Sequence, residues 1–323
     1  MKIFLRSPGN AKGARRKLSL KAREARLAYL LTGPALIVVA LIILFPIIWN
    51  VVLSLQPIRM RDLATIKLWD LDHLSFDNYA RGLDRRFWTG LRVTLIYAFS
   101  STVLAVAVGL WAALVARDPF PGRNLFRACL LFPYVAPLVS SALIWRLMLD
   151  KHIGMVNVLL EHFGGAPVGW LTARALPVHI LGLGIKLPVV LITVILFEVW
   201  RIFPFAFLFI LARIQAIPDD MYEAARVDGA SPSQSLWYIT LPQLKAVFGT
   251  LFLLRFIVHF YKFGDVFLLS GGVAGTDVLS IQIYDWLFAR RNVGVAAAIG
   301  VLLALLLLAL AAVYQRWFST QEV

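Results

Sequence analysis

Charged side chains interrupt a long apolar stretch of this sequence, residues 246–269, and they are its first candidates for chemistry. Four of them follow one another at intervals of four, three and three residues: Arg255, His259, Lys262 and Asp265. On a helix, this spacing places all four on one face. Ionisable groups within a membrane-spanning helix are costly, so they are a functional hypothesis by default. We therefore predict that this face avoids lipid and meets either a polar solute or charged partners.

Aromatic residues alternate with these charges: Phe256, Phe260, Tyr261 and Phe263. Sugar rings stack on aromatic faces while their hydroxyl groups hydrogen-bond to polar side chains, so the mixture would suit a sugar pathway. In the structural alternative, Arg255 extends toward water or pairs with Glu198, Lys262 pairs with Asp265, and the aromatic rings only pack. Both interpretations stay open. The candidate pathway residues on this stretch are Arg255, Phe256, His259, Tyr261 and Lys262.

A second apolar stretch, residues 187–212, contains the charged residues Glu198 and Arg201. Residues three apart are neighbours on a helix, so these two could form an ion pair inside a bundle. They could instead line or gate a solute pathway, as charges within a membrane often do. We include both residues among the pathway candidates and keep the structural pair as the alternative.

The composition indicates which kind of protein must position these charges. Of 323 residues, 60% are hydrophobic and 15% are charged, whereas a soluble domain has roughly 45–50% and about 25%. These values exclude a water-soluble globule. A membrane helix needs about 20 mostly apolar residues, and six runs reach that length: 30–55, 93–116, 128–149, 187–212, 246–269 and 292–315. We predict an all-α fold, a polytopic membrane bundle of six transmembrane helices.

The net charge of +14 is concentrated at the N-terminus, where residues 1–29 contain nine cations and one acid. A basic segment can indicate nucleic-acid binding, but directly before an apolar span it is a topology signal, because cytoplasmic flanks collect Lys and Arg. We predict a cytoplasmic tail over 1–29, a membrane domain over 30–317, a cytoplasmic C-terminal tail over 318–323, and no nucleic-acid partner. The external segments are then residues 56–92, 146–186 and 266–291.

The longest polar connection on the predicted cytoplasmic side is residues 217–242, which we call the polar loop. Pro218 suits the first position of a helix, and Asp219 and Asp220 complement the helix dipole in its first turn. Gly229 follows about ten residues later as a C-terminal cap. The polar loop therefore begins with a short helix that ends at a glycine elbow.

A second helix is indicated after the elbow, because Ser231 and Gln234 have the spacing of a capping box. We expect it to run to Leu241 and to be broken at Pro242, since proline lacks the N–H that a helix interior needs. The first helix carries small residues and one acid that would let a partner surface approach and grip it. On spacing alone it fits a docking helix or an ordinary cytoplasmic loop. Its residues include Met221, Glu223, Ala224, Ala225 and Asp228.

One spaced motif covers the polar loop: Glu223-Ala224-Ala225, three residues, Gly229, nine residues, then Ile239-x-Leu241-Pro242. It resembles the EAA loop of permease subunits from binding-protein-dependent ABC importers, where a coupling helix sits in a cleft of the cytoplasmic ATPase subunit. The form EAARVDGAS followed by ITLP is similar to the sugar branch, the maltose and glycerol-3-phosphate permease type. The resemblance implies a type I importer permease fold. It assigns ATPase coupling to Glu223, Ala224, Ala225, Asp228 and Gly229.

The resemblance extends over nearly the whole chain. Residues 199–218 are similar to the stretch that precedes the coupling loop in this branch, and residues 76–79 to its external segment before the second helix. Ser270-Gly271-Gly272 with Thr276 resembles a glycine-rich turn after the fifth helix. Val273 stands where proline is usual in that turn, so the resemblance does not predict the geometry of the turn here.

The sequence has no Gly-Lys dipeptide, hence no P-loop that could cradle phosphates, and its five histidines lack zinc-site spacing. We predict no catalysis, no metal and no cofactor in this chain. The resemblance implies partners instead: a second permease subunit, two ATPase subunits that hold ATP and Mg, an extracytoplasmic solute-binding protein, and the lipid of the cell inner membrane. The expected function is sugar import driven by ATP hydrolysis on the ATPase subunits.

Two other functions stay open. An ion-coupled secondary transporter of a small polar solute would use Asp265 or Glu198 as its proton-coupling group, but it leaves the motif spacing unexplained. An ABC importer of a non-sugar solute such as a glycerol phosphate fits the motif equally well. The basic residues of the fifth span would suit either a sugar or a phosphate.

Overall fold

The computed structural model describes residues 20–63, 74–180 and 183–318, and the structural statements below concern these residues. They are mostly helical, which confirms the predicted fold class. By its internal contacts the chain divides into two compact units, Met1–Asn50 and Val51–Val323, and each unit is described by itself.

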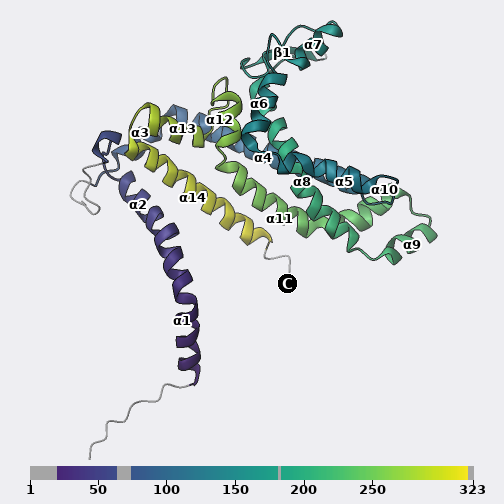
Figure 1. The fold of residues 1–323 in the computed structure, drawn as a ribbon, viewed down its shortest axis with the longest axis horizontal. Helices are drawn as coiled ribbons and strands as arrows, with labels where there is room; N and C mark the ends of the chain where they lie inside the picture. Colours follow the sequence, from purple (N-terminus) through teal and green to yellow (C-terminus); the bar gives the residue numbers. More distant parts are fainter. Residues whose placement is uncertain (1–19, 64–73, 181–182, 319–323) are drawn as a thin grey trace, which may run out of the picture. The chain divides into compact units, whose positions relative to one another are not determined.

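The first unit contains most of the first predicted span. Helix α1 (Leu20–Val39), the π-helical turn η1 (Ala40–Leu44) and helix α2 (Phe45–Ser54) follow one another directly along the chain (Figure 1). The apolar helical stretch covers Leu27–Ser54, close to the predicted range 30–55. Residues 1–19 of the predicted basic tail lie outside the described part of the chain.

Four long helices of the second unit run beside one another (Figure 1): α4 (Arg85–Val115), α8 (Val189–Gln215), α11 (Leu241–Phe260) and α14 (Val293–Phe318). The residue ranges of helices α8 and α14 agree within three residues at each end with the predicted fourth and sixth spans, 187–212 and 292–315. Among the described residues, five helices are long and apolar enough to cross a membrane, or up to six if a bent pair counts as one span.

Shorter elements connect the long helices. They are η2 (Met60–Asp62), α3 (Asp77–Gly82), α7 (Met155–His162), β1 (Leu176–Ile180), β2 (Leu183–Leu187), α9 (Asp219–Val227), α12 (Gly264–Ser270), α13 (Leu279–Tyr284) and η4 (Asp285–Ala289). Strands β1 and β2 form an antiparallel hairpin in which Leu176 pairs with Leu187. This hairpin was not predicted from the sequence.

The third predicted span, 128–149, is not one continuous helix. It comprises α5 (Arg123–Val135) and α6 (Leu138–Met148), which are bent by 95° at the break between them. Pro137 has no N–H with which to continue the helix, and Ala136 before it is extended, with φ −62° and ψ 135°, as residues before proline prefer. One continuous helix was the wrong prediction, because apolar composition alone does not reveal this bend, although the bent pair can count as one span.

The second predicted span begins earlier than its apolar run. Helix α4 starts at Arg85 instead of residue 93, because Asp84 caps it by accepting the N–H of Phe87 at 2.9 Å. Arg86, in the first turn, lies 2.7 Å from Asp277 and also pairs with Asp285. The predicted span began at residue 93 because charged residues precede it in the sequence. The helix nevertheless extends through these residues, because Arg86 is paired with acids.

The second helix of the polar loop also differs from the prediction. Helix α10 (Pro232–Ser235), the π-helical turn η3 (Leu236–Thr240) and α11 form one continuous helix, Pro232–Phe260. Pro242 does not break it, because the wider π turn precedes the proline, with the N–H of Leu241 bonded to the carbonyl of Leu236. A π turn changes the hydrogen-bond ladder locally and so accommodates the proline ring.

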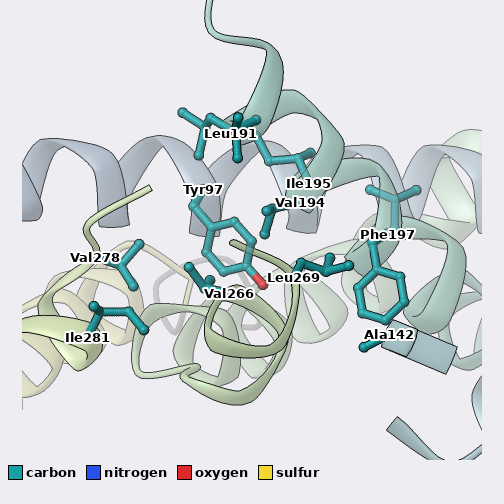
Figure 2. Close-up of a cluster of buried hydrophobic side chains, with 12 residues drawn as sticks. Tyr97, Ala142, Leu191, Val194, Ile195, Phe197, Val266, Leu269, Val278 and Ile281 are labelled. Carbon is teal, nitrogen blue, oxygen red and sulfur yellow. The ribbon is translucent and has the colours of Figure 1, made fainter. Parts of the chain in front are cut away.

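A buried apolar cluster joins α4, α8 and α12 within the second unit. Tyr97 of α4 packs in this cluster with Val194 and Phe197 of α8 and with Val266 and Leu269 of α12 (Figure 2). The cluster holds the short helix α12 against α8. It therefore determines which charged side chains of the fifth-span stretch can reach those of α8.

Helices α4 and α8 approach each other closely at Gly109. A Cβ atom on Gly109 would lie 2.7 Å from Ala206 Cβ and 2.8 Å from Phe207 N. Gly109→Ala is therefore expected to push the helices apart and to destabilise the protein by about 1–3 kcal/mol, seen as a lower unfolding temperature. Gly33→Ala is the matched control, because no atom lies within 4 Å of a Cβ there. Equal losses in both variants would contradict this account.

Candidate functional site

The charged residues of the fifth predicted span do not share one helix. Helix α11 ends at Phe260, Tyr261 leaves it with φ −100° and ψ 7°, and α12 begins at Gly264. Lys262 therefore lies in the break, and Ser280 donates a hydrogen bond to its freed carbonyl at 2.7 Å. The prediction of one continuous span over 246–269, with four charges on one face, was wrong.

Glu198 of α8 is fully buried and accepts contacts from two sides. Its Oε1 accepts a hydrogen bond from Lys262 Nζ at 2.6 Å and lies 3.0 Å from His259 Nε2. The other ring nitrogen, His259 Nδ1, hydrogen-bonds Thr102 Oγ1 of α4 at 2.9 Å. Helices α4, α8 and α11 therefore meet around one carboxylate.

Asp265 of α12 is a second fully buried carboxylate. Its Oδ2 lies 2.8 Å from Lys262 Nζ, and its Oδ1 lies 3.7 Å from Arg201 Nε. Lys262 thus bridges two acids, as the structural alternative for Lys262 and Asp265 proposed. The predicted ion pair between Glu198 and Arg201 was wrong. Arg201 instead pairs with Asp265, which the packing of α12 places beside it, and Glu198 pairs with Lys262.

These five side chains form what we call the buried charge cluster: Glu198, Arg201, His259, Lys262 and Asp265. The cluster contains two acidic side chains, two basic side chains and one histidine. Several buried polar atoms in or beside it have no hydrogen-bond partner among the described residues: Tyr97 Oη, Ser101 Oγ, Glu198 Oε2 and Arg201 Nη1. Because buried polar atoms are normally hydrogen-bonded, these four atoms are an unusual feature of the cluster.

Arg255 lies apart from the buried charge cluster. Its guanidinium carbon is 3.6 Å from the ring centroid of Phe205 and 6.0 Å from that of Tyr134. A cation over an aromatic face is favourable when it is desolvated, and Arg255 is only 9% exposed. Arg255 therefore neither extends into water nor pairs with Glu198. Phe205 and Tyr134 were missed in the sequence because aromatic residues are common in apolar runs.

The two aromatic pathway candidates lie elsewhere. Phe256 faces an apolar groove of about 270 Å³ between α4, α11 and α14, together with Phe99 and Phe252. Tyr261 is half exposed. The ring contacts of Phe256 are with Phe252 and Phe260, which are not members of the buried charge cluster. Of the predicted pathway residues, the structure brings together Glu198, Arg201, His259 and Lys262.

The polar loop has the local geometry that its sequence predicted. Helix α9 occupies Asp219–Val227, and Gly229 follows it in the left-handed conformation with φ +79°, which glycine adopts without steric cost. Ser231 and Gln234 form the capping box: the N–H of Ser231 donates to Gln234 Oε1 at 2.7 Å, and the N–H of Gln234 donates to Ser231 Oγ at 3.4 Å.

One buried side chain attaches α9 to the rest of the second unit. Tyr222 is buried, its hydroxyl lies 3.0 Å from Thr240 Oγ1, and the guanidinium carbon of Arg117 lies 3.8 Å from its ring centroid. Residues on the other side of the loop, Glu223, Ala224, Asp228 and Gly229, are exposed, and Ala225 is half-buried. Helix α9 therefore presents the predicted docking residues outward while Tyr222 holds it in place.

Tyr222→Phe is expected to destabilise the protein by about 1 kcal/mol, the net worth of one hydrogen bond. The variant keeps the ring under Arg117 and removes only the hydroxyl that contacts Thr240. Tyr222→Ala removes both contacts and should cost clearly more. The unfolding temperatures of the two variants measure the difference, and identical values would show that the ring contributes nothing.

Within the described residues, no group of three or more His, Cys, Asp or Glu side chains is arranged to hold a metal ion. The absence of a metal and of a cofactor from the whole chain stays a prediction. Thr102, which orients His259, was also missed in the sequence analysis. A single threonine in an apolar helix gives no signal, so only its contact identifies it.

Residues 105–321 match the protein family described as binding-protein-dependent transport system inner membrane component. The trehalose/maltose transport system permease protein MalF of Thermococcus litoralis is 34% identical, over 92% of this chain and 95% of that protein. The trehalose transport system permease protein SugA of Mycobacterium tuberculosis is also 34% identical, over 87% and 84%. A solved bacterial ABC transporter involved in import of the acidic polysaccharide alginate matches with a TM-score of 0.77 at 20% identity, over 94% of this chain and 98% of that one. This last similarity shows a shared fold.

Proposed function

The chain belongs to the family of binding-protein-dependent transport system inner membrane components, and from that premise we propose that it is the permease subunit of an ABC importer for a sugar. Two relatives with 34% identity are named as trehalose or trehalose/maltose permeases, which supports the sugar class. Family membership favours this function over an ion-driven secondary transporter. As a permease subunit, the chain is not itself the enzyme that hydrolyses ATP.

The geometry of α9 carries the coupling role. Its outward residues, Glu223, Ala224 and Asp228, are open to a partner, whereas Tyr222 links the helix to Arg117 and Thr240. Movement of α9 by a bound ATPase subunit would therefore be transmitted to the segment after α4 and to the start of the continuous helix Pro232–Phe260. Transmission of this kind is consistent with alternating access by rigid-body motion.

The proposed partners follow from this role. They are a second permease subunit, two ATPase subunits that bind ATP and Mg, and an extracytoplasmic solute-binding protein. The basic tail before the first span supports an orientation with both termini in the cytoplasm of the cell. The apolar helices and the family membership support a location in the inner membrane.

The buried charge cluster is the proposed contact for the solute in this chain. Its paired charges already compensate one another, whereas Glu198 Oε2 and Tyr97 Oη lack partners among the described residues. Uncharged hydroxyl groups fit these atoms better than a phosphate would, because a phosphate needs an uncompensated cation. This supports a sugar over a glycerol phosphate. Arg255 on Phe205 lies on the same two helices, α11 and α8, and completes the proposed pathway.

A tagged purification in mild detergent tests the proposal. We expect a second permease and two copies of an ATPase to co-purify, and the reconstituted complex to hydrolyse ATP faster when a trehalose- or maltose-loaded binding protein is added. Purification of the chain alone, with solute uptake driven by a proton gradient and independent of ATP, would contradict it.

A further inference from the structure

A cavity of about 530 Å³ with charged residues in its wall lies between the end of α6, residues 149–152 and 169–172, and the turn after α12. Its wall includes two cations, Arg146 and Lys151, one acid, Asp150, and the aromatic ring of Trp170. The roles proposed above do not use this cavity. It belongs to the segments 146–186 and 266–291, which the predicted topology places outside the cell membrane.

One buried asparagine organises the cavity wall. Asn157 Nδ2 donates to the carbonyl oxygens of Lys151 at 3.0 Å and Val168 at 2.9 Å, and its Oδ1 accepts the indole N–H of Trp170 at 2.9 Å. The N–H of Val168 donates to the same oxygen at 3.0 Å. These bonds hold the backbone at Lys151 and the ring of Trp170 in fixed positions, so the cavity is formed before any ligand arrives.

Among the described residues, the cavity wall contains two cations and one acid, so it keeps an excess of one positive charge. Asp150 Oδ1 accepts the backbone N–H groups of His152 at 2.8 Å and Ile153 at 3.1 Å, and these bonds hold the pKa of Asp150 below its ordinary value. Arg146 reaches only the carbonyl of Leu268, at 3.5 Å, and Lys151 has no ion pair among the described residues. Arg146 and Lys151 thus remain available to a negative group.

We propose that this cavity is a docking site for an acidic side chain of the extracytoplasmic solute-binding protein. The inference rests on the proposed function and on the topology that it implies. A carboxylate suits Arg146 and Lys151 better than the hydroxyl groups of a neutral sugar, because charge-assisted hydrogen bonds are roughly twice as strong as neutral ones. Complementary charges also speed encounter and set the orientation of docking.

The test uses the reconstituted transporter complex and measures ATP hydrolysis against the concentration of its solute-loaded binding protein. In the double variant Arg146→Gln with Lys151→Gln, the concentration for half-maximal stimulation is expected to rise about tenfold. Its dependence on salt should weaken, because fewer charges meet across the interface. The basal and maximal rates should stay unchanged. Glu161→Gln is the matched control, since Glu161 is an exposed charge of the same segment outside the cavity, and it should behave as wild type.

The outcomes separate the two proposals. If no binding protein stimulates the wild-type complex, the proposed function fails. If the wild type is stimulated and the double variant needs the same concentration of binding protein, the docking inference is overturned and the proposed function stands. A change only in the sugar concentration required, at saturating binding protein, would make the cavity a sugar site and would also overturn docking.

Discussion

Replacing Glu198 by alanine is expected to destabilise the folded protein by about 3–5 kcal/mol, the cost of breaking a buried ion pair from one side. Glu198 is fully buried, and its Oε1 accepts Lys262 Nζ at 2.6 Å and faces His259 at 3.0 Å. The variant leaves both groups inside the protein with Asp265 as the one carboxylate still beside Lys262, at 2.8 Å. We expect a lower unfolding temperature of the purified complex and less permease in the membrane.

A double variant separates the ion pair from simple loss of packing. In Glu198→Leu with Lys262→Met, the remaining pair of Asp265 and Arg201 is still balanced, so this variant should be more stable than either single change. Glu161→Ala removes an exposed acid and should change stability by no more than about 0.5 kcal/mol. The explanation fails if Glu198→Ala unfolds at the wild-type temperature. It also fails if the loss of stability in the double variant equals the sum of the losses in Glu198→Leu and Lys262→Met.

The variants Glu223→Lys and Gly229→Asp are expected to insert into the membrane normally and to abolish stimulation of ATP hydrolysis by the binding protein. Glu223 is exposed and contacts Arg226 at 3.7 Å, and such surface pairs contribute about 0–1 kcal/mol to folding. Reversal of its charge should therefore spare the fold and disturb only the docked partner. The measurements are membrane content, basal ATP hydrolysis, its stimulation, and sugar uptake by proteoliposomes.

A matched substitution isolates the cause at Gly229. Its φ of +79° favours glycine, but asparagine also tolerates this conformation. Gly229→Asn should therefore retain more coupling than Gly229→Asp. The two new side chains have nearly the same size, but only aspartate adds a negative charge beside Asp228. Unchanged uptake with both Glu223→Lys and Gly229→Asp would remove the coupling role from α9.

Local hydrogen bonding explains why the polar loop was predicted well. The end of α9 at Gly229 and the capping box of Ser231 and Gln234 involve residues within a few positions of one another. Each of these contacts depends on residue type and spacing alone. The prediction of a helix break at Pro242 was wrong because a π turn, which residue types and spacing do not signal, accommodates the proline.

The sequence by itself determined the membrane class of the chain, its principal apolar helices and the glycine elbow and capping box of the polar loop, because composition, run length and capping residues act locally. Only the tertiary structure decided which charges meet. Glu198 and Arg201 are neighbours on α8, yet their partners come from the break after α11 and from α12. Ion pairing in a buried interior follows the three-dimensional packing of helices distant in sequence, and spacing along one helix cannot specify that packing.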